Sequence, residues 1–229
     1  MTTPIKLKFS EKCNKEHSQQ YLQKHHDGIF RRLSRLRDEH IARQALELAG
    51  NPGLVLDLPS GAGRFWPLLA EKQGRVIIGA DTSRDMLNTA FQAQPREVVE
   101  RVELLQTSAF DIDLPEHSVD CIFCMRLLHH VGRAENRQAM LKEFHRVTRD
   151  TVIVSLWVDG NFKSWRRRKL ETKRACGEES TDEKNRFVIP QSVIEAEFEQ
   201  AGFVIVDRID FLPLYAMWRV YVLRAVDQK

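Results

Sequence analysis

The chain has little of what several protein classes depend on. Its four cysteines (Cys13, Cys121, Cys124 and Cys176) are too few and too scattered for the disulfide framework of a small secreted protein. No run approaches the roughly 18 apolar residues of a membrane-spanning helix, and the first ten residues contain lysines but no apolar signal segment. Internal repeats and low-complexity tracts are also missing. These absences predict a soluble, cytoplasmic protein with reduced thiols.

A strong charge of one sign is missing as well. The 229 residues include 35 basic and 32 acidic side chains, a net charge of +3, which does not call for a nucleic-acid partner. Cys121 and Cys124 form a C-x-x-C, but no second pair exists and both lie in an apolar strand pattern. We therefore predict that these two thiols pack in the core, and we predict no metal site.

What the chain does contain is an alternation of helix and strand patterns. Residues 1–50 are charged and helical, with apolar residues spaced by three and four from Tyr21 to Ala49, and a glycine- and proline-rich stop follows at 50–53. Beyond it, strands are predicted at 54–58, 76–80, 101–106, 119–124, 151–157, 203–209 and 217–225, and helices near 64–73, 83–92, 134–147 and 190–201. This alternation predicts a mostly parallel sheet with helices on both faces.

The order of elements at the end of the chain refines this fold. About seven residues, including Pro213, separate the last two predicted strands. A parallel crossover needs a dozen or more residues, so these strands must form an antiparallel hairpin. The predicted fold class is therefore α/β, a Rossmann-like three-layer αβα sandwich whose seven-stranded, mostly parallel sheet ends in an antiparallel hairpin strand.

The most informative segment runs from Val55 to Arg64, with the sequence V-L-D-L-P-S-G-A-G-R. An apolar strand ends in Asp57, and a turn with Gly61 and Gly63 leads into a helix. Glycines at this spacing let the backbone pass close to a ligand. About twenty residues later a second apolar strand ends in Asp81, where Rossmann-type folds hold a ribose by its hydroxyl groups. Together these features predict a nucleoside site.

Four ordered segments resemble the class I S-adenosylmethionine-dependent methyltransferases, in the broad group that includes quinone-biosynthesis enzymes. They are 55–64, the acid at 81 with its neighbours, 107–115, and 119–130, which ends in L-H-H. The likeness covers roughly residues 50–225. It implies an N-terminal helical lid segment (1–50) and an S-adenosylmethionine-binding methyltransferase domain (51–229) with a cap insertion at about 159–188.

The chain departs from the family pattern at Pro59 and Ser108, and from the dinucleotide-binding fingerprint at Trp66, whose bulky ring argues against a pyrophosphate site. Pro59 replaces the usual first glycine, which a turn can accept because proline fixes φ near −65°. Ser108 stands where an aspartate often contacts the adenine amino group, and Trp66 replaces the third glycine of a dinucleotide fingerprint. The resemblance implies contacts to S-adenosylmethionine, and to its product S-adenosylhomocysteine, from Asp57, Pro59, Gly61, Gly63, Arg64, Asp81, Thr82, Met86, Ser108, Ala109, Phe110, Cys124 and Met125.

Histidines near the expected methyl position are the candidate catalytic residues. His129 and His130 follow the fourth strand, and one is a candidate general base or acceptor-orienting group while the other packs or caps a helix. A purely structural role stays open for each. Tyr21, His25 and His26 lie on the N-terminal helix that the resemblance implies as a lid, where a solvated helix face is the alternative.

The segment from Asp159 to Val188 is predicted to govern the choice of acceptor. Residues 163–174 hold seven basic side chains and one acid, and four acids follow at 178–183, so an anion site and an internally neutralised mobile loop both stay open. The leading prediction is methyl transfer to a small molecule or an anionic glycan or lipid precursor. The alternatives are an RNA or protein methyltransferase that uses the basic stretch, and a binding module without activity. The oligomeric state is left open.

Overall fold

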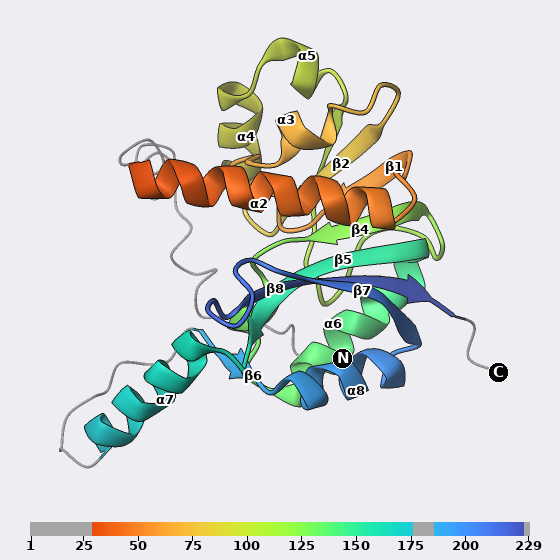
Figure 1. The fold of residues 1–229 in the computed structure, drawn as a ribbon. Helices are drawn as coiled ribbons and strands as arrows, with labels where there is room; N and C mark the ends of the chain where they lie inside the picture. The colour runs from red at the N-terminus through yellow and green to blue at the C-terminus, as the bar shows by residue number, and fades with distance from the viewer. Residues whose placement is uncertain (1–28, 176–185, 227–229) are drawn as a thin grey trace.

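The computed structural model describes residues 29–175 and 186–226, which form a single twisted sheet with helices on both faces (Figure 1). The strand order across the sheet is β3-β2-β1-β4-β5-β8-β7, and β6 pairs with β5 outside this path. The strands are β1 (Leu54–Asp57), β2 (Val76–Asp81), β3 (Val102–Gln106), β4 (Val119–Cys124), β5 (Thr148–Val158), β6 (Val188–Ile189), β7 (Phe203–Asp210) and β8 (Trp218–Ala225).

The sheet has the predicted direction of strands. β1 to β5 pair in parallel, while β8 runs antiparallel to both of its neighbours, β5 and β7. The short connection from β7 to β8 is therefore the predicted hairpin, and it places the last strand inside the sheet. The two-residue strand β6 is additional to the seven predicted strands. It was missed because two residues carry no period that a sequence pattern can reveal.

The helices are α2 (Ile29–Leu48), α3 (Trp66–Leu69), α4 (Arg84–Ala93), α5 (Arg96–Val99), α6 (Ala134–Val147), α7 (Phe162–Ala175), α8 (Gln191–Gln200) and the 3₁₀ turn η2 (Leu128–His130). They agree with the predictions except at α3 and α7 and at two short elements that were not predicted, α5 and η2. The helix expected at 64–73 shrinks to the four-residue α3, because polar residues and Gly74, which has φ +79°, follow it. The mobile-loop alternative for the basic segment is wrong over 162–175, which form α7.

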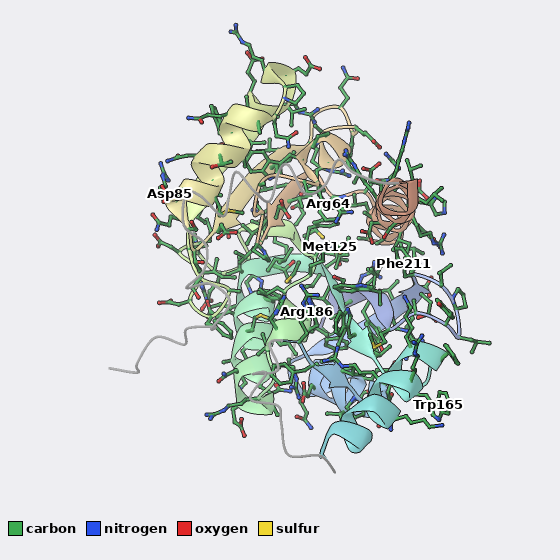
Figure 2. The ribbon with its side chains drawn as sticks, turned by 90° about the vertical axis from the view of Figure 1, so that its left-hand side faces the viewer. Arg64, Asp85, Met125, Trp165, Arg186 and Phe211 are labelled. Carbon is green, nitrogen blue, oxygen red and sulfur yellow. The ribbon has the colours of Figure 1, made fainter. Side chains whose placement is uncertain are left out.

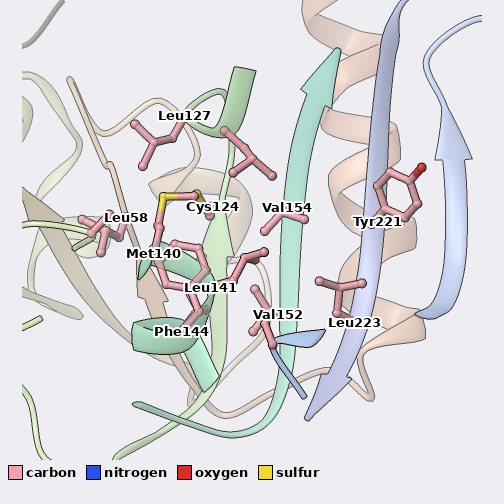
Figure 3. Packing of buried hydrophobic residues seen from close by; sticks show 14 of the residues in the cluster. Leu58, Cys124, Leu127, Met140, Leu141, Phe144, Val152, Val154, Tyr221 and Leu223 are labelled. Atoms are coloured by element: carbon pink, nitrogen blue, oxygen red, sulfur yellow. The ribbon is translucent and has the colours of Figure 1, made fainter. Parts of the chain in front are cut away.

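Two apolar layers sandwich the sheet. Residues of α2, α3, α4 and α5 pack against one face, and residues of α6 and α8 against the other. Figure 3 shows the second layer, in which Met140, Leu141 and Phe144 of α6 lie against β4, β5 and β8. Cys121 and Cys124 are buried on opposite faces, as an odd separation along a strand requires. Core packing of both thiols is confirmed.

The carboxyl ends of the parallel strands meet at one edge of the sheet, where ligands of open α/β folds bind. Figure 2 looks toward this edge, on which Arg64 follows β1, Met125 follows β4 and Arg186 precedes β6. The predicted lid helix is described from Ile29 onward as α2, and Tyr21, His25 and His26 lie outside the described residues. Among the helices that the structure describes, none is long and apolar enough to cross a membrane.

Candidate active site

The loop after β1 is held by backbone hydrogen bonds to both neighbouring strands. The Leu58 amide donates to Phe123 O at 3.1 Å, and the Ser60 amide donates to Ala80 O at 2.8 Å. Pro59, after a cis peptide bond, lies between them. Gly61 and Gly63 have φ of +54° and +68°, a region that residues with a Cβ rarely adopt. The predicted glycine turn is therefore present at the carboxyl end of β1.

Trp66, the departure from the dinucleotide fingerprint, fills the space beneath this loop. Its buried ring lies 2.8 Å from the point where a Cβ on Gly63 would stand and 2.5 Å from the equivalent point on Gly79. The second contact explains the glycine in the middle of β2, because any side chain there would collide with the ring. In a dinucleotide-binding fold, the third glycine of the fingerprint lets the helix approach the strand closely. Here Trp66 stands at that position, and its ring packs against Gly79 of β2 instead.

Asp57 lies buried at the end of β1 and is bound to the same ring. Its Oδ2 accepts a hydrogen bond from Trp66 Nε1 at 3.0 Å. Burial, with a smaller contribution from the carboxylate of Asp81, raises the pKa of Asp57 to about 7 against the opposing effect of hydrogen bonds from Ser60 and Trp66. A buried carboxyl group in this state is stabilised as an anion by any cation that binds beside it.

Asp81 lies at the end of β2, next to the same loop. Its Oδ2 accepts from the Gly61 amide at 3.0 Å and its Oδ1 accepts from the Ser83 amide at 2.9 Å. Burial raises the pKa of Asp81, and these backbone hydrogen bonds oppose the rise. Oδ1 also accepts from Thr82 Oγ1 at 3.5 Å, whereas Oδ2 has a second lone pair that can accept from a ligand hydroxyl group. Asp81 therefore fastens the glycine loop to β2 and retains capacity for the predicted ribose contact.

Two further predicted contacts follow Asp81. Thr82 is exposed, and Met86 is buried on α4, where its Cε comes within 3.8 Å of the position of a Cβ on Gly61. Ser83 caps α4 by accepting from the Met86 amide at 3.3 Å. Met86 therefore borders the glycine loop, while Thr82 lies beside the Asp81 carboxylate, to which its Oγ1 donates at 3.5 Å.

The third predicted segment forms a tight turn after β3. Ser108 Oγ accepts from the Phe110 amide at 3.2 Å, and the Thr107 amide donates to Asp81 O at 3.1 Å. Ala109 is buried and Phe110 is half-buried. The Phe110 amide is engaged within the turn, which leaves the predicted contact with adenine to other groups of this segment.

The exit from β4 is joined to the glycine loop by a residue that the sequence analysis did not select. β4 ends at Cys124, and Met125 and Arg126 follow it, the latter with φ +66°. Asp38 of α2 accepts hydrogen bonds on its Oδ2 from Arg64 at 2.6 Å and from Arg126. This carboxylate therefore ties α2 to both loops that flank the candidate site.

His129 and His130 lie in an aromatic cluster on the other side of the Met125–Arg126 turn. The His129 ring stacks on Trp157 of β5, with centroids 5.2 Å apart, and meets the edge of Trp218 of β8 at 4.7 Å. Burial lowers the pKa of His129 to about 2, helped by His130 and two arginines, so this imidazole is neutral. Among the described residues, His129 Nδ1 and Trp157 Nε1 are buried without a hydrogen-bond partner.

Guanidinium groups cover the outer side of this cluster. Arg167 and Arg186 lie over the Trp157 ring at 5.1 and 5.8 Å, and Arg126 lies over Trp218 at 5.3 Å. Next to them is a cavity of about 240 Å³. Its lining consists of Asp159, Ser164, Arg167, Arg168, Arg186, Phe187, Val188 and Pro190. Three arginines against one aspartate make the described wall of this cavity positive.

The edge of the sheet thus carries two groups of side chains: the predicted cofactor residues near β1 and β2, and the aromatic–arginine cluster near β5. Sequence reasoning missed Asp38, Trp218 and Arg186. A signal existed for Asp38 alone, since it lies three residues before Ile41 on the apolar stripe of α2, where a carboxylate needs a partner. No group of three metal-ligating side chains occurs among the described residues.

Known proteins resemble this chain in sequence and in fold. Residues 56–156 match the family model of a methyltransferase domain. An uncharacterized methyltransferase-like protein of Schizosaccharomyces pombe is 30% identical over 100 residues, which are 44% of this chain and 36% of that protein. The matched region therefore spans about a third of the length of this curated relative.

Two solved structures share the fold at low sequence identity. A magnesium protoporphyrin IX methyltransferase from Synechocystis, determined with bound S-adenosylhomocysteine, superposes with a TM-score of 0.72 at 18% identity, over 93% of this chain and 96% of that one. A methyltransferase from Aquifex aeolicus gives a TM-score of 0.63 at 17% identity, over 94% and 100%. The domain match over residues 56–156, the strand order with its antiparallel β8 and the glycine loop make the chain similar to the class I S-adenosylmethionine-dependent methyltransferases.

Proposed function

We propose that the chain transfers the methyl group of S-adenosylmethionine to a small, negatively charged acceptor. The observation that carries the proposal is the pair of buried carboxyl groups, Asp57 and Asp81, at the ends of adjacent parallel strands on either side of a glycine loop. A cationic amino acid joined to a ribose needs this combination of groups. The quinone-biosynthesis branch and the identity of the acceptor stay predictions.

The residues present fit the donor. Asp57 would bind its ammonium group, because an adjacent cation compensates the buried carboxylate, and Asp81 would accept hydrogen bonds from the ribose hydroxyls. Gly61 and Gly63 would let the backbone approach, since a Cβ at either position would strain the turn. When bound, S-adenosylmethionine supplies a methyl group already activated by its sulfonium. The protein then has mainly to position the acceptor.

The aromatic–arginine cluster supports an acceptor with an apolar, planar part and an anionic part. Trp157, Trp218 and His129 form the apolar wall, in which Trp157 Nε1 can donate a hydrogen bond and His129 Nδ1 can donate or accept one, depending on its tautomer. Arg167 and Arg186 border the cavity beside this wall and offer the fork geometry that carboxylates and phosphates bind.

The two histidines have different roles in this proposal. His129 is buried, stacked and neutral, which suits a residue that orients the acceptor. His130 is half-buried, with its ring centroid 4.1 Å from that of His129, and is the better candidate to accept a proton. The RNA alternative gains no support, because the cations of α7 surround the helix. Arg167 faces Trp157, whereas Lys169 lies over Trp165.

Calorimetric titration with S-adenosylhomocysteine tests the donor site. We expect Asp57→Asn and Asp81→Asn each to weaken binding by about 1–3 kcal/mol, the value of a hydrogen bond to a charged group. Asp85→Asn is the matched control, since this exposed acid begins α4 on the same side of the molecule (Figure 2). Equal affinity in all three variants would remove the two carboxylates from the site.

Transfer of a labelled methyl group tests the activity and the acceptor class. The donor is offered with separate metabolite, lipid and transfer-RNA fractions, and we expect label in small anionic compounds of the metabolite or lipid fraction. Arg186→Gln should raise KM for that acceptor with little change in kcat. Tight binding of S-adenosylhomocysteine with no labelled fraction would favour a binding module instead, and salt-sensitive labelling of transfer RNA would favour the nucleic-acid alternative.

A further inference from the structure

An exposed apolar surface lies on the outer side of α7, away from the candidate active site. It consists of Phe162 and Trp165 of α7 and Leu212, Leu214 and Tyr215 of the loop between β7 and β8, and we call it the α7 surface. The Trp165 side chain is 56% exposed and Leu214 is 83% exposed. Single exposed apolar residues are ordinary, but five large ones gathered in one place indicate an interaction site.

The α7 surface is preformed. The Phe162 and Lys163 amides donate to Leu214 O and Tyr215 O at 2.9 and 3.1 Å, which joins the start of the helix to the loop. The Phe162 ring stacks on Tyr215 at 5.9 Å with an interplanar angle of 11° and lies 5.9 Å from Trp165. An open hollow of about 750 Å³ adjoins these rings.

Cations flank this surface in the part of the chain that the structure describes. Residues 160–170 contain five lysines and arginines and no aspartate or glutamate. Lys163 Nζ lies 5.1 Å from the Tyr215 ring centroid, and Lys169 Nζ lies 5.2 Å from that of Trp165. These contacts place positive charge directly beside the exposed rings.

The helix repeat separates this surface from the inner side of α7. At about 100° per residue, Phe162, Trp165, Arg166 and Lys169 fall within roughly 100° of one another. Ser164, which is 2% exposed, lies on the opposite side. α7 is therefore amphipathic in an unusual sense: its outer face combines aromatic rings and cations, and its inner face packs against the domain.

We propose that the α7 surface docks the protein onto an anionic lipid bilayer. Aromatic rings and leucines enter the interfacial region of a bilayer, while flanking lysines and arginines attract its anionic headgroups. Figure 1 shows α7 projecting from the body of the molecule, which leaves its outer side accessible to a bilayer. RNA would use the cations and rings, but it offers nothing to Leu212 and Leu214.

Sedimentation of the full chain with vesicles tests this proposal independently of the proposed enzymatic function. We expect binding to vesicles of phosphatidylcholine mixed with phosphatidylglycerol, little binding to phosphatidylcholine alone, and weaker binding at high salt. Lys163→Glu and Lys169→Glu should each reduce the partition coefficient about fivefold or more. The double variant Trp165→Ser with Leu214→Ser should reduce it by about tenfold or more.

Matched controls come from the opposite end of the molecule. Phe91→Ser replaces a comparably exposed ring on α4, and Arg96→Glu reverses an exposed charge on α5, and neither should change vesicle binding. Unaltered affinity for S-adenosylhomocysteine in all variants shows that they are folded and that docking is separate from donor binding. Three results would overturn the proposal: no binding of the wild type to anionic vesicles, equal losses in the control variants, or equal binding to neutral vesicles.

Discussion

The glycine loop after β1 and the aromatic cluster around Trp157 lie at the same edge of the sheet, but different contacts hold them. Most groups of the glycine loop are bound within about twenty residues, as when Gly61 binds Asp81, and the backbone provides nearly all the donors. The aromatic cluster joins residues from η2, β5 and β8, and its order comes from ring stacking and guanidinium groups.

This difference suggests that the two regions have separate roles, one in binding the methyl donor and the other in binding the acceptor. We call the glycine loop with Asp57 and Asp81 the donor side, and its backbone geometry depends little on the side chains around it, apart from these two carboxylates. We call the aromatic–arginine cluster the acceptor side. It depends on side chains brought together from distant segments, so a few substitutions there can change which molecule is methylated. The predictions below test how separate the two sides are.

The largest effect is expected on the acceptor side, where an ion pair is fully buried. Glu197 of α8 binds Arg137 of α6 through both oxygens, at 2.5 and 2.7 Å, and Arg137 also donates to Val131 O and Gly132 O just after the histidines. Glu197→Ala leaves a buried guanidinium without its partner and should lower the free energy of unfolding by about 3–5 kcal/mol. Urea unfolding of the wild type and of Glu197→Ala measures this loss of stability.

A double variant checks the cause of that loss. Arg137→Met with Glu197→Met removes both charges and should recover much of the stability, because paired apolar replacements are often close to neutral. Methyl transfer should still suffer, since the loop after His130 loses the Arg137 contacts. If Glu197→Ala costs less than about 1 kcal/mol, the ion pair does not support the acceptor side.

The next effect concerns the donor side and depends on pH. The folded-state pKa of Asp57 is about 7, above its unfolded value, so the folded chain binds more protons between roughly pH 4 and 7. Stability is therefore greatest below pH 4, as far as this group is concerned, and falls as pH rises to 7. The loss of stability is on the order of 4 kcal/mol for a pKa raised from 3.8 to about 7.

Asp57→Asn isolates this contribution. The variant should lose this part of the pH dependence and be more stable than wild type at pH 8 in the absence of ligand. Affinity of the wild type for S-adenosylhomocysteine should rise through pH 7, because the ionised carboxylate binds the ammonium. Parallel stability–pH curves for the two proteins would show that Asp57 does not titrate in this range.

A smaller effect is expected where Trp66 supports the glycine loop. A Cβ at position 79 would stand 2.5 Å from Trp66 Cζ2, so Gly79→Ala should destabilise by about 1–3 kcal/mol. Adding Trp66→Phe removes the colliding atoms and should make the two changes strongly non-additive. Gly53→Ala is the control, because its nearest neighbour is 3.4 Å away. If the changes in unfolding free energy of Gly79→Ala and Trp66→Phe are additive in the double variant, the two residues are not in contact.

The sequence predicts the donor side well because its signals are local. Glycines need positive φ at fixed positions, acids end apolar strands, and the hairpin follows from the length of one connection, so strand order and Asp57, Gly61, Gly63 and Asp81 could all be anticipated. The helix at 64–73 was overestimated because turn residues compete with helix propensity within the same few residues.

The acceptor side could not be predicted in the same way. Its contacts join positions 28 to 89 residues apart, such as His129 with Trp157 and with Trp218, and no local period marks them. The sequence leaves open whether 162–175 form a loop, because the charge density of this segment obscures its apolar positions and the buried Ser164 gives no hydrophobic signal.

Asp38 is the residue that connects the two sides, and its removal should have a modest effect on both. Its carboxylate binds Arg64 of the glycine loop and Arg126, whose guanidinium lies over Trp218 of the aromatic cluster. Asp38→Asn should cost about 1–2 kcal/mol of stability, weaken S-adenosylhomocysteine severalfold and raise KM for the acceptor. Glu39→Gln, beside it on α2, alters an ion pair with Arg35 and should change neither constant. If Asp38→Asn changes one constant and leaves the other at the wild-type value, α2 supports a single side, and the donor and acceptor sides are independent structures on a common sheet.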